Sequence, residues 1–69
     1  MFTIKDFLEI SHGDIFLNIH RHKFENPVIN GTVEWIRGEI GDDIEQAQVY
    51  EIYENGKHEL MLIIEPEIW

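Results

Sequence analysis

The run HELMLIIE, residues 58–65, constrains the fold of this chain more than any other stretch. Successive residues of a strand point to opposite faces, and here both faces are apolar. One face would carry Leu60, Leu62 and Ile64, and the other Met61 and Ile63. A strand that is apolar on both faces is expected at the centre of a sheet. The sequence therefore predicts a sheet in which the last strand is an inner one.

Three other segments are predicted to be strands. Residues 14–22 alternate, with Ile15, Leu17 and Ile19 on one face. Residues 28–36 would form the second strand, and one of its faces would carry Ile29, Gly31, Val33 and Trp35. Residues 48–54 form the third expected strand. It leads into Asn55-Gly56, a pair that favours a type I′ hairpin turn because both residues tolerate positive φ.

Two helices are expected between these strands. Thr3 and Asp6 have the spacing of a capping box, which predicts a helix over residues 4–10, and Phe2 and Phe7 could clamp its entry as a hydrophobic staple. Asp42 and Glu45 mark the capped start of a second, very short helix. The prediction is thus one α+β domain over residues 1–69, in the order α-β-β-α-β-β. Its four-stranded antiparallel sheet has the helices on one face.

Charge limits the possible partners. The chain has 5 Lys and Arg against 14 Asp and Glu, so its formal net charge is −9. Binding of nucleic acid or an anionic membrane through phosphate contacts would oppose that field, so a basic partner protein is favoured. Without cysteine, disulfides and thiolate zinc sites are excluded. We see no leader peptide and no apolar run near the roughly 20 residues of a membrane span, so we expect a cytoplasmic protein.

Six acidic residues and no basic one lie in the stretch EIGDDIEQAQVYEIYE, residues 39–54. Carboxylates at 42, 43 and 45 would be favoured at a helix start, but those at 39, 51 and 54 have no such local reason. Residues two apart on a strand are about 6.7 Å apart, of the order of one step of a phosphate backbone. The stretch is therefore interpreted either as an imitation of phosphates or as a solvated surface. The candidate partner-binding residues are Glu39, Asp42, Asp43, Tyr50, Glu51, Tyr53 and Glu54.

Catalysis and metal binding are not expected. Ser11, His12 and Asp14 are too close in sequence to converge as a catalytic triad, and no nucleotide-binding glycine loop is present. His20 and His22 share a strand face, which is a metal-ligand spacing, but two ligands make no site. We therefore predict no enzyme activity, no cofactor and no metal.

Three places resemble small proteins encoded by phages and mobile elements of Gram-positive bacteria. They are the opening TIKDFLE at residues 3–9, the segment EIGDDIEQAQV at residues 39–49, and the apolar last strand. The resemblance departs at Gly41, where a proline would be expected. Small acidic proteins from such elements are often inhibitors of host defence, including anti-CRISPR and anti-restriction proteins, and many occupy a nucleic-acid channel. The resemblance thus implies a nucleic-acid mimic acting in the bacterial host.

The sequence as a whole leads to one functional hypothesis and one alternative. The hypothesis is a non-catalytic acidic binding protein, a phage or mobile-element antagonist that occupies a basic, nucleic-acid-binding surface of a host protein. The alternative is a homo-oligomeric structural or regulatory module that uses an open sheet face or Trp69 as its seam.

Overall fold

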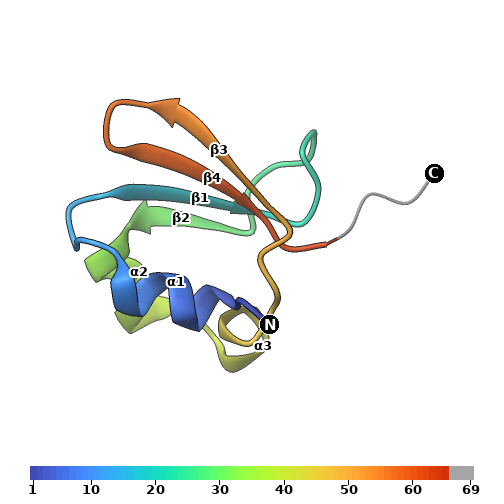
Figure 1. Ribbon diagram of the computed structural model, residues 1–69, viewed down its shortest axis with the longest axis horizontal. Helices are drawn as coiled ribbons and strands as arrows, with labels where there is room; N and C mark the ends of the chain where they lie inside the picture. The colour runs from blue at the N-terminus through green and yellow to red at the C-terminus, as the bar shows by residue number, and fades with distance from the viewer. Residues whose placement is uncertain (66–69) are drawn as a thin grey trace.

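The computed structural model describes residues 1–65, and in this part of the chain four strands form one sheet with the helices on one side of it (Figure 1). Pro66, expected to stop the last strand, and Trp69 lie outside the described residues. The elements, in chain order, are α1 (Ile4–Ile10), β1 (Phe16–His20), β2 (Ile29–Thr32), α2 (Val33–Glu39), α3 (Asp42–Glu45), β3 (Glu51–Gly56) and β4 (Glu59–Ile63).

The first helix begins as its sequence predicts. The backbone N–H of Asp6 donates to the Thr3 hydroxyl at 3.2 Å, and the N–H of Thr3 donates to the Asp6 carboxylate at 3.1 Å. The capping box is therefore complete. Phe2 and Phe7 also meet, edge to face, with ring centroids 6.3 Å apart. Local side chains thus fix both the start and the direction of α1.

The second strand is shorter than predicted, because a helix begins inside the segment assigned to it. β2 ends at Thr32, whose hydroxyl accepts a hydrogen bond from the Trp35 N–H and so caps α2. Carbonyls of the α1–β1 connection satisfy the next N–H groups: Val33 donates to Ile15 and Glu34 to Gly13. The predicted strand over 28–36 is therefore wrong after Thr32.

The sheet is mixed, which corrects the expected antiparallel sheet. Its order is β2-β1-β4-β3, and β1 and β4 are parallel while the other pairs are antiparallel. The reason is the return path of α2 and α3 beneath the sheet, which lets β3 start from the same end as β2 (Figure 1). β4 then turns back and runs beside β1 in the same direction. A parallel pair needs such a crossover connection.

The remaining predicted elements are confirmed with shifted boundaries. β4 is an inner strand, as its two apolar faces indicate. The short helix α3 forms, but its N-cap is Gly41, and no side chain caps it. The hairpin turn lies at residues 57–58 rather than at Asn55-Gly56, which belong to β3. His58 takes a φ of 61° there, and the register is irregular between Glu54 and Gly56.

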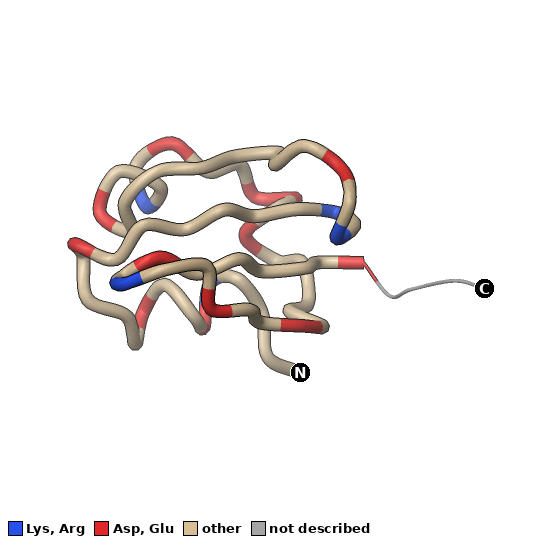
Figure 2. Tube along the Cα trace, turned by 90° about the horizontal axis from the view of Figure 1, so that it is seen from above, with Lys and Arg blue, Asp and Glu red and all other residues tan. Residues whose placement is uncertain are grey.

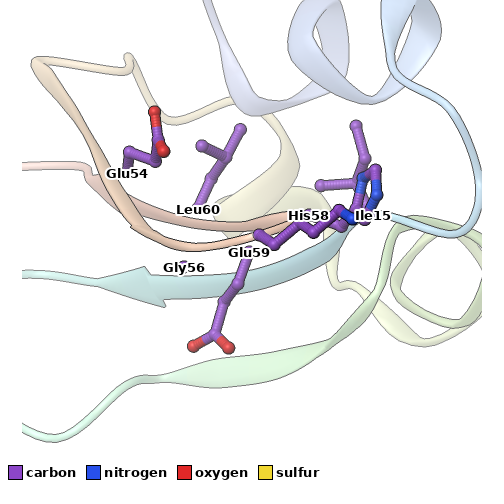
Figure 3. Close-up of a pocket in the computed structure, with 7 residues that line it drawn as sticks. Ile15, Glu54, Gly56, His58, Glu59 and Leu60 are labelled. Atoms are coloured by element: carbon purple, nitrogen blue, oxygen red, sulfur yellow. The ribbon is translucent and has the colours of Figure 1, made fainter.

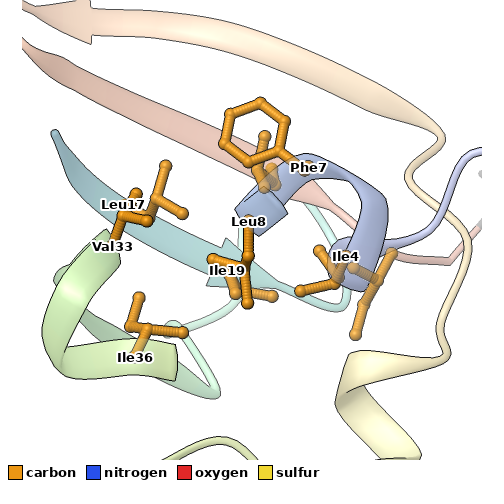
Figure 4. Packing of buried hydrophobic residues seen from close by; sticks show 9 residues of the cluster. Ile4, Phe7, Leu8, Leu17, Ile19, Val33 and Ile36 are labelled. Carbon is orange, nitrogen blue, oxygen red and sulfur yellow. The ribbon is translucent and has the colours of Figure 1, made fainter. Parts of the chain in front are cut away.

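The core lies between the helices and one face of the sheet (Figure 4). α1 and α2 each place apolar residues one helical turn apart against β1 and β4, which is the periodicity of a buried helix face. The buried cluster comprises Ile4, Phe7, Leu8, Leu17, Ile19, Val33, Ile36, Leu62 and Ile64. No helix within residues 1–65 is long and apolar enough to cross a membrane.

Candidate binding surface

Strand β3 divides the candidate binding residues between two sides of the sheet. Ile52 pairs with Leu62, which is fully buried against the helices, so Ile52 points to the helix side. Because side chains alternate along a strand, Glu54 also points to that side, whereas Tyr50 precedes β3 and is exposed. Glu51 and Tyr53 point to the opposite side. We call the sheet surface away from the helices the open face.

The open face carries polar residues around a small apolar centre. Its members follow from the pairing register, since directly paired residues share a face. They are Asn30 and Thr32 of β2, Phe16, Asn18 and His20 of β1, Glu59, Met61 and Ile63 of β4, and Glu51 and Tyr53 of β3. Ile63 is only 1% exposed although no described helix covers this face. Phe16 is 38% exposed.

The first polar group of the open face consists of Glu51, Tyr53 and Lys23. The Tyr53 hydroxyl donates to the Glu51 carboxylate at 2.9 Å. The Lys23 ammonium lies 4.8 Å from the centroid of the Tyr53 ring and 5.8 Å from that of Phe24. Lys23 belongs to the connection between β1 and β2, whereas Tyr53 is on β3, at the far edge beyond β4. The β1–β2 connection therefore lies close enough to β3 to bring the Lys23 ammonium over the Tyr53 ring.

Glu59 is the centre of a second polar group, which sequence reasoning missed. One of its oxygens accepts hydrogen bonds from the amides of Asn18, at 2.9 Å, and Asn55, at 3.1 Å. Two amides hold the carboxylate in one orientation. Asn18 is 41 positions away in sequence, and only the parallel pairing of β1 with β4 brings it close. No local pattern marks Glu59 as different from its acidic neighbours.

The helix side of the β3–β4 hairpin is hollowed. A cavity of about 290 Å³ lies there, at the end of the hairpin. Its lining residues are Ile15, Glu54, Gly56, Lys57, His58, Glu59 and Leu60. Figure 3 shows Glu54 and Leu60 extending to one side of the hairpin and Glu59 to the other. Glu54 therefore lies beside an apolar hollow and away from Glu51, with which sequence reasoning grouped it.

The other three candidate acids belong to the helix layer. Glu39 ends α2, and Asp42 and Asp43 begin α3. All three are exposed. They lie close together because only Ile40 and Gly41 separate the two helices. The sheet stands between them and the Glu51–Tyr53 pair, so the seven candidate residues occupy more than one surface. Figure 2 shows acidic positions distributed around the whole trace.

Positive side chains do little to neutralise these acids. Within residues 1–65 no carboxylate lies within ion-pair distance of a lysine or arginine; one histidine contact, His22 Nε2 to Glu65 Oε2 at 3.6 Å, is present. Arg37 is used elsewhere: its guanidinium donates to the carbonyls of Leu8 and Ser11 near the end of α1. The negative charge is therefore left to face the surroundings.

His20 ends β1 and His22 lies two residues beyond it, and this histidine pair acquires no further ligand among the described residues. His20 Nδ1 lies 2.7 Å from the carbonyl oxygen of Glu25, and His22 contacts Glu65. In this part of the chain, no three histidine or acidic side chains come together as a metal site would require. Ser11 hydrogen-bonds the Phe7 carbonyl at 2.7 Å, so its hydroxyl closes the end of α1.

Comparisons of the chain with protein-family models, with curated proteins and with solved structures found no match.

Proposed function

We propose that this protein is a non-catalytic acidic binding protein that occupies a basic surface of another protein. One observation supports this most directly: a chain of net charge −9 has no lysine–carboxylate or arginine–carboxylate ion pair within residues 1–65. Paired charges would cancel locally, whereas unpaired carboxylates build a negative potential around the molecule. Such a potential attracts a positively charged surface and accelerates its docking.

The open face adds the contacts that a docking surface needs. Glu51 and Glu59 are each oriented by neighbouring side chains, and Phe16 offers apolar area between polar residues. Tyrosine, such as Tyr53, is a frequent anchor in protein interfaces. Oriented carboxylates lose less conformational entropy on pairing with a guanidinium than mobile ones do.

The resemblance of residues 3–9 and 39–49 to phage proteins suggests the class of partner. A host protein that handles nucleic acid presents lysine and arginine to phosphates. Carboxylates can take the place of those phosphates as hydrogen-bond acceptors for guanidinium groups. The proposed partner is therefore a nucleic-acid-handling protein of the bacterial host, and the protein acts as an antagonist by filling its nucleic-acid site.

The test is capture of partners from a bacterial lysate, followed by release with nucleic acid. Immobilised protein is incubated at about 0.05 M and about 0.5 M NaCl, because screening weakens attraction between exposed charges. A true partner binds only at low salt and is displaced by an added DNA or RNA oligonucleotide. Binding that persists at high salt, or that nucleic acid does not displace, contradicts the proposal.

Charge reversal then separates the surfaces. Glu51→Lys alters the open face, Glu54→Lys the hollow on the helix side, and Asp42→Lys with Asp43→Lys the start of α3. Each variant is first checked for an unchanged circular dichroism spectrum. Loss of partner binding in at least one variant is expected, while full binding by all three variants would remove the proposal.

Self-association is the alternative that the same samples test. The open face, with Phe16 at 38% exposure, could meet a second copy. Two chains of charge −9 repel each other, so we expect a monomer at micromolar concentration and low salt. Sedimentation that shows a stable dimer would instead favour a homo-oligomeric module.

A further inference from the structure

The open face already holds one cation, and it comes from the chain itself. The Lys23 ammonium sits over the Tyr53 ring, 4.8 Å from its centroid. The hydroxyl of the same ring donates to the Glu51 carboxylate at 2.9 Å. An aromatic face attracts cations through its quadrupole, and a carboxylate at the ring edge adds to the attraction. Together these groups form a cation site on β3.

Lys23 is weakly held in that site. Its side chain is exposed, and among residues 1–65 no carboxylate lies within ion-pair distance of its ammonium group. Among the described residues, Lys23 is held by its contacts with the Tyr53 and Phe24 rings. Exposed cation–π contacts are weak, and a lysine side chain keeps many rotamers when it is released. A stronger cation can displace it without disturbing the core.

We propose that the Tyr53–Glu51 site binds an arginine side chain of the partner, and that Lys23 occupies the same site in the free protein. This inference rests on the proposed function and names one contact through which the partner would bind. A guanidinium is flat, so it can stack on the Tyr53 ring and direct two N–H groups at Glu51. The Lys23 ammonium contacts the ring, but no carboxylate of residues 1–65 lies within ion-pair distance of it. Charge complementarity selects a basic partner over a second acidic copy of this chain.

Removal of Lys23 should therefore tighten binding of the partner, whereas loss of an ordinary binding residue weakens it. Lys23→Met removes the ammonium from the Tyr53 ring, and Lys57→Met serves as the matched control because both changes remove one exposed lysine. The probe is a fluorescent nona-arginine peptide at low salt. Both variants gain from the extra negative charge, but Lys23→Met is expected to bind about two- to fivefold more tightly than Lys57→Met. In a Tyr53→Leu background this difference disappears.

Nuclear magnetic resonance measures the displacement directly. The tyrosine ring shifts the signals of the Lys23 side-chain methylenes in the free protein, and nona-arginine is expected to return them to ordinary lysine positions. The Lys57 signals provide the internal control.

Each outcome decides between the two proposals. Displacement of Lys23 together with tighter binding by Lys23→Met supports the site. Salt-sensitive peptide binding with unmoved Lys23 signals, or equal affinities of Lys23→Met and Lys57→Met, overturns the site but leaves the proposed function standing. Absence of salt-sensitive binding of nona-arginine by every variant overturns both.

Discussion

Gly31 lies on β2 with a φ of +152°, and its missing side chain makes room for Trp35. A Cβ atom built at this position would stand 2.6 Å from Cε3 of the Trp35 ring. Gly38, within α2, has nothing within 4 Å of the same hypothetical atom. The two glycines therefore differ in what they contribute: the first permits a close contact and an unusual backbone conformation, and the second only weakens a helix.

Alanine substitutions at these two glycines should act in opposite directions. Gly31→Ala is expected to lower the free energy of unfolding by about 1–3 kcal/mol through strain and displacement of Trp35. Gly38→Ala is expected to raise it by about 0.5–1 kcal/mol, because alanine favours the helix and restricts the unfolded chain. Urea denaturation of the two variants measures both. Equal changes in the free energy of unfolding would show that the position of the Trp35 ring does not require glycine at residue 31.

At the scale of elements, two connections take forms that sequence patterns do not specify. The β3–β4 hairpin turns at residues 57–58 although Asn55-Gly56 favours a turn, because β3 continues to Gly56 beside Glu59. α2 begins at Val33 because carbonyls of Gly13 and Ile15 accept its first N–H groups. In the hairpin, strand pairing outweighs the local turn preference, and at α2 hydrogen bonds to a distant segment outweigh the preference for a strand.

The hairpin gives a prediction based on backbone conformation. His58 has a φ of 61°, which costs free energy for a residue with a Cβ atom. His58→Gly is therefore expected to raise the free energy of unfolding by about 0.5–1 kcal/mol, after allowance for the greater freedom of glycine when unfolded. Lys57→Gly is the control, because Lys57 does not share the positive φ, and it should lower stability. Thermal unfolding followed by circular dichroism compares the stability of the two variants. Lower stability in both variants would contradict the assigned turn.

The contact between α1 and α2 gives a second prediction at this scale. The Arg37 guanidinium donates to the carbonyls of Leu8 and Ser11. Arg37→Met keeps the apolar stem but removes these hydrogen bonds. Because the group is exposed, we expect the free energy of unfolding to fall by only about 1 kcal/mol. Arg37→Lys should recover only part of it, since an ammonium lacks the planar fork. Arg21→Met, with no hydrogen bond to Arg21 among the described residues, should change the urea midpoint little.

The whole molecule carries more negative charge than its contacts neutralise. Exposed carboxylates repel one another in the folded state, and salt screens that repulsion. Salt bridges would be weakened by the same screening, but within the described range Lys and Arg form none with carboxylates. The net effect of salt on folding should therefore be stabilising.

Salt titration tests this expectation. The urea midpoint should rise between about 0.01 M and about 0.3 M NaCl. The variant Glu39→Lys with Asp43→Lys changes the net charge from −9 to −5, since each replacement adds 2. Its midpoint should respond less to salt than that of the parent protein. A midpoint that falls with added salt would mean that attractive ion pairs dominate.

The sequence could predict much of the fold but only part of the candidate surface. The Thr3–Asp6 capping box and the alternation around Leu17 and Ile19 were sufficient for α1 and β1. The acidic stretch includes Glu51 and Tyr53, which share the open face. It also grouped them with Glu54 and Asp42, which the structure places on the helix side. Charge density along a sequence does not show which face of a sheet receives each charge.

What the sequence determined by itself is what neighbouring residues decide among themselves: the capped start of α1, the apolar faces of β1 and β4, and the inner position of β4. These features depend on hydrogen bonds and periodicities within a few residues. Only the tertiary structure decided where α2 begins, that β1 and β4 run parallel, and that Lys23 meets Tyr53. Each of these depends on groups far apart in sequence, which become partners only after the helices carry the chain back beneath the sheet.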